Sequence, residues 1–144
     1  YKVDYASGAV EEMVLKYKNS EYLIIEGQGS LLNPGSTATL PLMRGSCPTA
    51  LVLCHRLGLK VVESETKILI PPLEQVISLN EQLVTGLNSF PTAKVKAVAL
   101  DTRGYDHASA INEISKMEDK LNLPVTDPVR FSAKKIANAL IYLN

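Results

Sequence analysis

The sequence is poor in cysteine and has no excess of charge of either sign. Only two cysteines occur, Cys47 and Cys54, and they do not form a C-x-x-C pair. A disulfide framework is therefore excluded, and we expect a reducing, cytoplasmic location. The 15 basic and 15 acidic side chains cancel, so the chain has no overall attraction to nucleic acid or to an anionic membrane. We expect neither as a partner.

Long apolar runs and several familiar motifs are also absent. Runs such as residues 50–54 are too short to cross a bilayer. The two cysteines and two scattered histidines lack the ligand spacings of a zinc site. Neither the phosphate-binding pattern G-x-x-x-x-G-K-[ST] nor the dinucleotide pattern G-x-G-x-x-G occurs. If the protein binds a phosphate group, the main cradle must come from residues outside this chain.

Short apolar runs alternate with amphipathic patterns along the chain. Hydrophobic residues make up 46% of the sequence and charged residues 21%, as in ordinary globular proteins. Apolar runs predict strands, and apolar positions at the helical period predict helices. The expected strands cover residues 22–26, 50–55, 94–100 and 123–126. Helices are expected to begin at Ser7 or Gly8, near Thr37, at Pro71-Pro72 and after Asp106, and a last one to contain Ile136, Leu140 and Leu143.

This alternation predicts a single α/β domain over residues 1–144, with three α/β/α layers and a mainly parallel sheet. Right-handed crossovers would place helices on both faces of that sheet. A parallel α/β domain usually starts with a buried strand, whereas this sequence runs almost at once into a helical pattern near Ser7. We therefore expect the chain to be the C-terminal portion of a longer protein, with the N-terminal part of the fold missing.

Polar residues follow each predicted strand, and the carboxyl ends of parallel strands are where open sheets bind ligands. Glu26 directly follows an apolar run and stands beside Gly27 and Gly29, whose backbone N–H groups could approach an anion closely. The carboxylate of Glu26 could hold Mg²⁺ through a water molecule or accept a proton. The alternative is a strand-end turn in which Glu26 only pairs with a neighbour.

The other candidate site residues are His55, Arg130 and Asp4. His55 could act as a general base or an orienting group, or be a hydrogen-bonded histidine at a strand end. Arg130 could bind a carboxylate or a phosphate with its fork of N–H groups, or form a salt bridge to Asp127 that fixes the turn at Pro128. Asp4 could lie at the edge of the site or cap the first helix.

Several of these runs together resemble a known family. They are Glu26 to Leu31 with Pro34 following, Gly45-Ser46 before Pro48, the strand of residues 50–55, Asp101-Thr102, and Asp127 to Arg130. The chain resembles the C-terminal domain of the D-glutamate N-acetyltransferase-like proteins, formerly uncharacterised P-loop proteins, and more distantly the dethiobiotin synthetase-like enzymes. One departure from the family pattern is Gly35-Ser36, where an aromatic and a small residue are usual.

The resemblance implies a P-loop NTPase-like fold, an N-terminal domain of the same protein as partner, and acetyl-CoA as co-substrate. It makes Glu26 the acidic strand-end residue. It makes the adjoining residues Gly27, Gln28, Gly29 and Ser30 the substrate-binding loop. Because part of the fold lies elsewhere, the fragment alone should be inactive.

Three hypotheses for function follow. The first is N-acetylation of an acidic D-amino acid, with Glu26 or His55 as base, Arg130 binding a substrate carboxylate, and the amides of Gly27 and Gly29 stabilising the oxyanion. The second is a nucleotide-binding, Mg²⁺-dependent ATPase or ligase in which Glu26 acts on the metal. The third is a non-catalytic assembly domain. We expect a small-molecule substrate and a homo-oligomer.

Overall fold

The computed structural model describes residue 2 and residues 5–62 and 67–141. In these ranges the helices are α1 (Ala6–Lys16), α2 (Thr39–Ser46), α3 (Leu73–Thr85), α4 (His107–Leu121) and α5 (Lys134–Ile141), and the strands are β1 (Ala50–Arg56), β2 (Lys94–Asp101) and β3 (Val125–Thr126). None of the described helices is long and apolar enough to cross a membrane. Asp4 and Leu143 lie outside the described residues.

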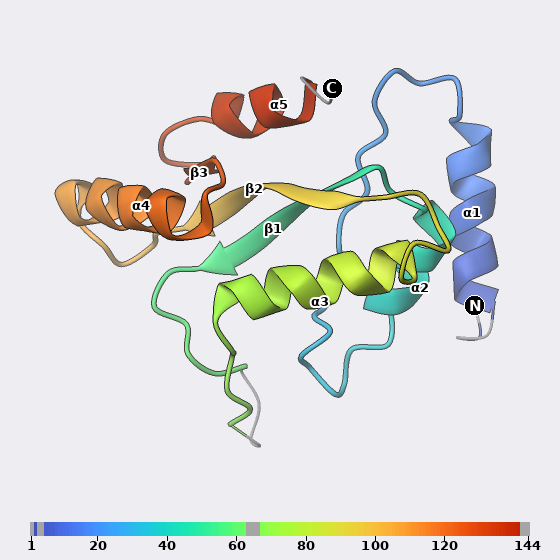
Figure 1. Ribbon diagram of the computed structural model, residues 1–144, viewed down its shortest axis with the longest axis horizontal. Coiled ribbons are helices and arrows are strands. Elements are labelled where there is room, and N and C mark those ends of the chain that lie inside the picture. Colours follow the sequence, from blue (N-terminus) through green and yellow to red (C-terminus); the bar gives the residue numbers. More distant parts are fainter. Residues whose placement is uncertain (1, 3–4, 63–66, 142–144) are drawn as a thin grey trace.

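The three strands form one parallel sheet in the order β1-β2-β3. Each strand therefore pairs with its neighbour in sequence, and a helix connects the two. Helices α3 and α5 cover opposite faces of the sheet (Figure 1), and α4 packs beside β3. This arrangement confirms the predicted α/β class with helices on both faces of a parallel sheet.

The core lies in the C-terminal half of the chain. Val98 and Leu100 of β2, Ile114 of α4 and Val125 of β3 are buried together. Strand β2 pairs on both edges and is covered by α3 and α5, and its burial pattern is nearly continuous rather than alternating. Helix α3 is attached to the start of β2 by Glu81, whose carboxylate accepts hydrogen bonds from the Val95 backbone N–H at 2.9 Å and from the Lys94 ammonium at 2.7 Å.

Helix boundaries in the sequence follow local chemistry. Asp106 caps α4 by accepting a hydrogen bond from the Ser109 backbone N–H, as predicted. Pro72 precedes the first residue of α3, which is also the predicted start. The prediction for α1 was wrong in detail: the helix begins at Ala6, its N-cap is Tyr5 and not Ser7 or Gly8, and no side chain caps it.

Two predicted strands differ from the structure. Residues 22–26 form no strand and are exposed, although their composition is that of one. A strand needs a neighbour to satisfy its backbone groups, and in the described part of the chain this segment has none. The last strand is shorter than predicted and covers only Val125 and Thr126, since Pro124 has no N–H to donate and contributes only its carbonyl, which accepts from Val98.

The contact between α1 and α2 depends on Gly45. A Cβ atom at this position would collide with the backbone of Ser7 and the side chain of Val10. We expect Gly45→Ala to lower the free energy of unfolding by about 1–3 kcal/mol, the usual effect of overpacking, as measured by urea denaturation. Gly8→Ala is the matched control, because a Cβ there meets nothing within 4 Å. Equal stability of the two variants would contradict this account of the packing.

Candidate functional site

A buried carboxylate joins the carboxyl ends of β2 and β3. Asp127 is only 5% exposed, and one of its oxygens accepts hydrogen bonds from the backbone N–H of Thr102 at 3.0 Å and from the Thr102 hydroxyl at 2.6 Å. Its other oxygen accepts from the backbone N–H groups of Val129 and Arg130, both at 3.0 Å. Burial alone would raise the pKa of Asp127, but these hydrogen bonds outweigh it and the pKa is lowered. Asp127 is therefore an ionised structural anchor.

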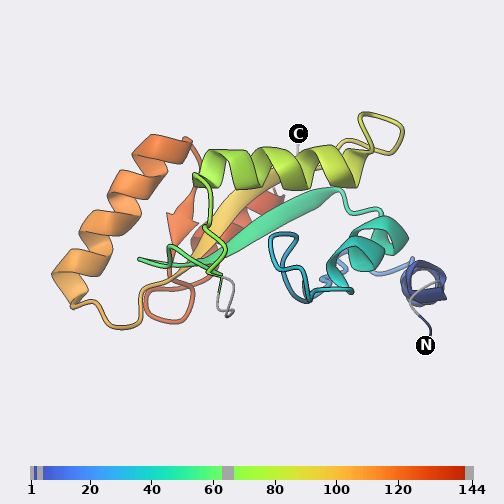
Figure 2. The same cartoon turned by 90° about the horizontal axis from the view of Figure 1, so that it is seen from below.

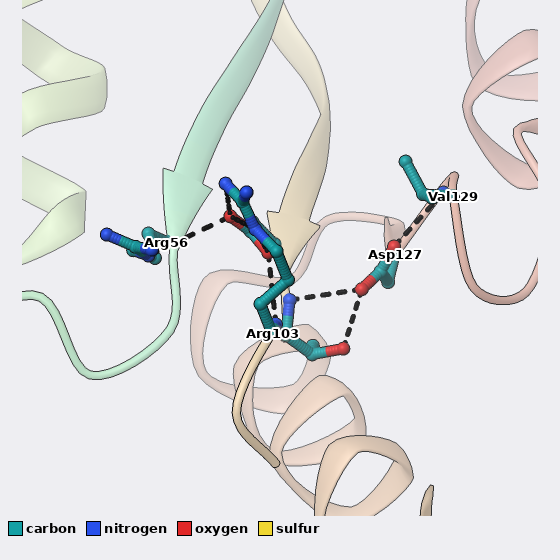
Figure 3. Close-up of polar contacts among 6 residues, drawn as sticks. Arg56, Arg103, Asp127 and Val129 are labelled. Carbon is teal, nitrogen blue, oxygen red and sulfur yellow. Dashed lines mark hydrogen bonds and ion pairs between the residues drawn. The ribbon is translucent and has the colours of Figure 1, made fainter.

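Two arginines meet a second carboxylate at the same edge (Figure 3). The Arg103 guanidinium donates to both oxygens of Asp101, with its Nη2 at 2.6 Å, and Arg56 at the end of β1 lies 3.9 Å from the same side chain. The Arg103 side chain and backbone N–H, with a smaller effect of Arg56, hold the pKa of Asp101 at about 2. At neutral pH Asp101 is thus an anion between two cations.

Arg130 has a structural contact in place of the predicted salt bridge. Its Nη1 donates to the backbone carbonyl of Tyr105 at 3.0 Å and to that of Asp106 at 3.4 Å. The alternative expectation of a salt bridge to Asp127 was wrong, because Asp127 accepts from the Arg130 backbone N–H and not from its guanidinium. Arg130 joins the loop after β3 to the loop before α4, and its side chain is exposed.

His55 lies near the end of β1, where it is half-buried. Burial lowers its pKa below the usual value of 6.5, because a charged imidazolium is poorly solvated there. The imidazole is therefore neutral at neutral pH. A neutral imidazole is the form that a general base requires.

The Glu26 to Ser30 loop is held by hydroxyl groups from the residues that follow it. The Ser30 backbone N–H donates to the Ser36 hydroxyl at 3.2 Å, and Thr39 donates to the Gln28 carbonyl at 2.7 Å. Ser36 and Thr39 are themselves 2.8 Å apart. Gly29 has a left-handed φ of 74° and is packed against the Ser36 side chain. Ser36, which departs from the family pattern, thus fixes the loop's conformation.

The structure brings some predicted site residues together and leaves others apart. His55 near the end of β1 and Arg130 after β3 lie at the same carboxyl edge, but β2, with Asp101 and Arg103 at its end, separates them. Glu26 is exposed in irregular structure. Among the described residues no hydrogen bond or ion pair joins it to His55 or to Arg130, so its expected place at the sheet edge is not formed within this chain.

The sequence predicted that the strand ends carrying Arg56, Asp101 and Arg103 converge at one edge, but it did not predict the contacts among these three side chains. Arg56 and Arg103 each follow a strand in the sequence, and that position was the available signal. The strand order is what makes them neighbours, and it could not be read from the sequence. The role of Asp127 had a local signal, because an Asp followed by Pro commonly accepts hydrogen bonds from backbone N–H groups two and three residues later.

The described residues do not supply a complete metal or phosphate site. They contain no group of three or more His, Cys, Asp or Glu side chains suited to hold a metal ion. The sequence also lacks the glycine-rich phosphate loop. A bound Mg²⁺ ion or nucleotide therefore stays a prediction, in which Glu26 could contribute one oxygen ligand.

The chain is an α/β domain with a parallel sheet, and its charged side chains lie at the carboxyl edge, which is where open sheets of this class bind ligands. The family model described as "Domain of unknown function (DUF1611_C) P-loop domain" matches residues 1–137, and the chain belongs to this DUF1611 family. A crystal structure of a DUF1611 family protein from Anabaena variabilis superposes with a TM-score of 0.95 at 48% identity, over 98% of this chain and 42% of that one. The P-loop fold expected from the resemblance is thereby confirmed.

Two curated relatives carry the name "D-glutamate N-acetyltransferase". The protein from Tritonibacter scottomollicae is 27% identical over 138 residues, which are 95% of this chain and 41% of the relative. The protein from Pseudoalteromonas sp. is 30% identical over 128 residues, 88% of this chain and 38% of the relative. These relatives confirm the resemblance to that family. The chain spans only about two fifths of their length.

Asp127 gives a test of the sheet edge. We expect Asp127→Asn to lower the free energy of unfolding by about 2 kcal/mol, because an amide NH₂ would face donors that need an acceptor. Urea denaturation measures it, with Asp119→Asn on the exposed face of α4 as control. The pKa of Asp127 is lowered, so its contribution is complete above the usual carboxyl pKa of 3.8 and is lost as the pH falls below that value. A difference between wild type and variant that grows on acidification would contradict this role.

Proposed function

We propose that this chain is part of an enzyme that transfers the acetyl group of acetyl-CoA to the amino nitrogen of D-glutamate or a similar acidic amino acid. The observation that carries the proposal is the alignment of two relatives named "D-glutamate N-acetyltransferase" along 95% and 88% of the chain. The charges at the sheet edge agree with it. An acidic amino acid has two carboxylates, and arginine forks are the groups best suited to bind them.

The proposed reaction forms a bond between the amino nitrogen and the acetyl carbonyl carbon and breaks the carbon–sulfur bond of the thioester. The ammonium group must first lose a proton, and the displaced thiolate leaves as a thiol after it gains one. His55 fits the role of base because burial keeps its imidazole neutral. Glu26 is the alternative base, and it could act only where the rest of the protein brings it to the edge.

The oxyanion of the intermediate and the two carboxylates of the substrate each need a hydrogen-bond donor or a cation. The backbone N–H groups of Gly27 and Gly29 are the proposed donors to the oxyanion of the tetrahedral intermediate. Gln28 and Ser30 border the acceptor in this proposal. Arg130 binds one substrate carboxylate. Arg103, whose side chain is 77% exposed although it is paired with Asp101, is placed to bind a second.

Thiol release by the full-length protein tests the activity. With acetyl-CoA and D-glutamate we expect a stoichiometric thiol signal and an N-acetylated product, with less from L-glutamate. His55→Gln should lower kcat by about 10²–10⁴, the usual contribution of a general base, whereas His107→Gln on the exposed surface of α4 should leave kcat unchanged. The acid limb of the rate profile should lie below pH 6.5, because the pKa of His55 is lowered. Absence of thiol release with every acidic amino acid of either hand would rule the proposal out.

A second candidate is a nucleotide-dependent ATPase or ligase, which the family description as a P-loop domain favours. In that case Glu26 contributes to a Mg²⁺ site that the rest of the protein completes. Titration of the full-length protein with ATP should then show binding that requires Mg²⁺ and weakens in Glu26→Gln. Glu21→Gln is the control, since Glu21 is exposed in the same irregular segment. ATP affinity that changes neither on removal of Mg²⁺ nor in Glu26→Gln would count against this candidate.

A further inference from the structure

Strand β1 has the composition of an interior strand but lies at the end of the sheet. It opens with four consecutive apolar residues, as parallel strands do when both faces are covered. Yet β1 pairs only with β2, and none of its residues is buried. Half of its backbone N–H and C=O groups therefore point away from β2, with no strand beside them in the described part of the chain. A free edge of this kind is an efficient template for another strand.

Residues 22–25 are an apolar segment that is exposed to solvent. They are Tyr, Leu, Ile and Ile in sequence, and all four are exposed, with Ile24 at 90%. In Figure 2 the blue stretch that follows α1 lies on the side of β1 away from β2. Burying one large apolar side chain contributes about 1.5–3 kcal/mol. Four such residues in a row on the surface indicate a contact that this chain does not itself provide.

The lack of burial extends over the whole N-terminal half. Among the described residues before Val76 none is buried, whereas the core belongs to the segments that follow. Helix α1 packs against α2 but still exposes Met13 and Leu15, and Tyr17 directly after the helix is exposed as well. The segments before α3 therefore contribute no buried side chain among the described residues, and residues 22–25 are a continuous apolar run within them.

We propose that a β-strand from the part of the full-length polypeptide outside residues 1–144 inserts between the free edge of β1 and residues 22–25. It pairs with β1 on one side, and residues 22–25 pair with its other side as a further strand. The sheet then continues past β1, which becomes an interior strand. Residues 22–25 gain the neighbour that their strand-like composition requires.

The lengths of the relatives favour a strand of the same polypeptide. The chain spans 41% and 38% of the two curated relatives and 42% of the Anabaena variabilis protein, so more than half of each relative lies outside the matched region. Attachment in one polypeptide gives such a strand a high effective concentration at the edge. A second copy related by a two-fold axis would place β1 against β1 and would leave residues 22–25 without a partner.

The insertion has a consequence for Glu26. Residues 22–25 lead directly into Glu26, so their incorporation into the sheet would carry this carboxylate to the same edge as His55 and Arg56. Glu26 is thus exposed in the present structure because the strand that would hold it at the edge comes from another part of the polypeptide. The inference concerns the architecture and does not depend on which reaction the site performs.

Hydrogen exchange on the full-length protein tests the insertion. We expect slow exchange for backbone amides in both residues 22–25 and the outward-facing positions of β1, at rates that do not change with protein concentration. Fast exchange in either segment would overturn the proposal. Protection that disappears on dilution would overturn it too, because it would assign the edge to a second copy.

A pair of substitutions in the full-length protein provides an independent measurement. Ile24→Asp should lower Tm by several degrees, because it would place a charge in a buried strand. Ile24→Val keeps an apolar side chain at this position and should have a Tm close to that of the wild type. Leu87→Asp is the control, since Leu87 is 77% exposed in the loop after α3. Equal Tm values for Ile24→Asp and Leu87→Asp would show that residue 24 remains in solvent and would refute the insertion.

Discussion

The carboxyl edge of the sheet depends on the buried carboxylate of Asp127. It accepts hydrogen bonds from both the backbone and the hydroxyl of Thr102, and so joins the end of β2 to the turn after β3. The same carboxylate holds that turn closed through two backbone N–H groups. Because β3 is only two residues long, its pairing with β2 is short, and the hydrogen bonds of Asp127 provide a further connection between the two strand ends. Arg130 adds a second connection between the same two loops, through the carbonyl groups of Tyr105 and Asp106.

The hydrogen bonds of Asp127 fix the backbone that carries the charged side chains of this edge. Asp101 and Arg103 follow directly after β2, and Thr102 between them is fixed by Asp127. Arg56 reaches the same carboxylate from β1. The positions of these side chains are therefore set by buried hydrogen bonds rather than by the surface ion pairs themselves, which contribute little to stability.

Most of the fold could be predicted from the sequence, and the parts that could not share a physical cause. Apolar runs, a proline pair and the Asp106 cap identified β1, β2, α3 and α4, because each is determined by local residues. Residues 22–26 were wrongly predicted as a strand, since a strand exists only when a neighbour satisfies its backbone. The convergence of the charged strand ends was predicted, but the contact of Arg56 with Asp101 was not, because these two residues are far apart in sequence and meet only through the strand order. His55 was identified by type and position, and the structure added that burial keeps it neutral.

The strand order has a consequence for how the domain folds. Each strand of the sheet pairs with the one next to it in the chain, across a single helix. The contacts that build the buried core around Val98 and Ile114 are therefore closed by short loops, which lose little chain entropy and form early. The segments before β1 contribute nothing to that core. The domain should thus have a nucleus in its second half, onto which the first half condenses late in folding.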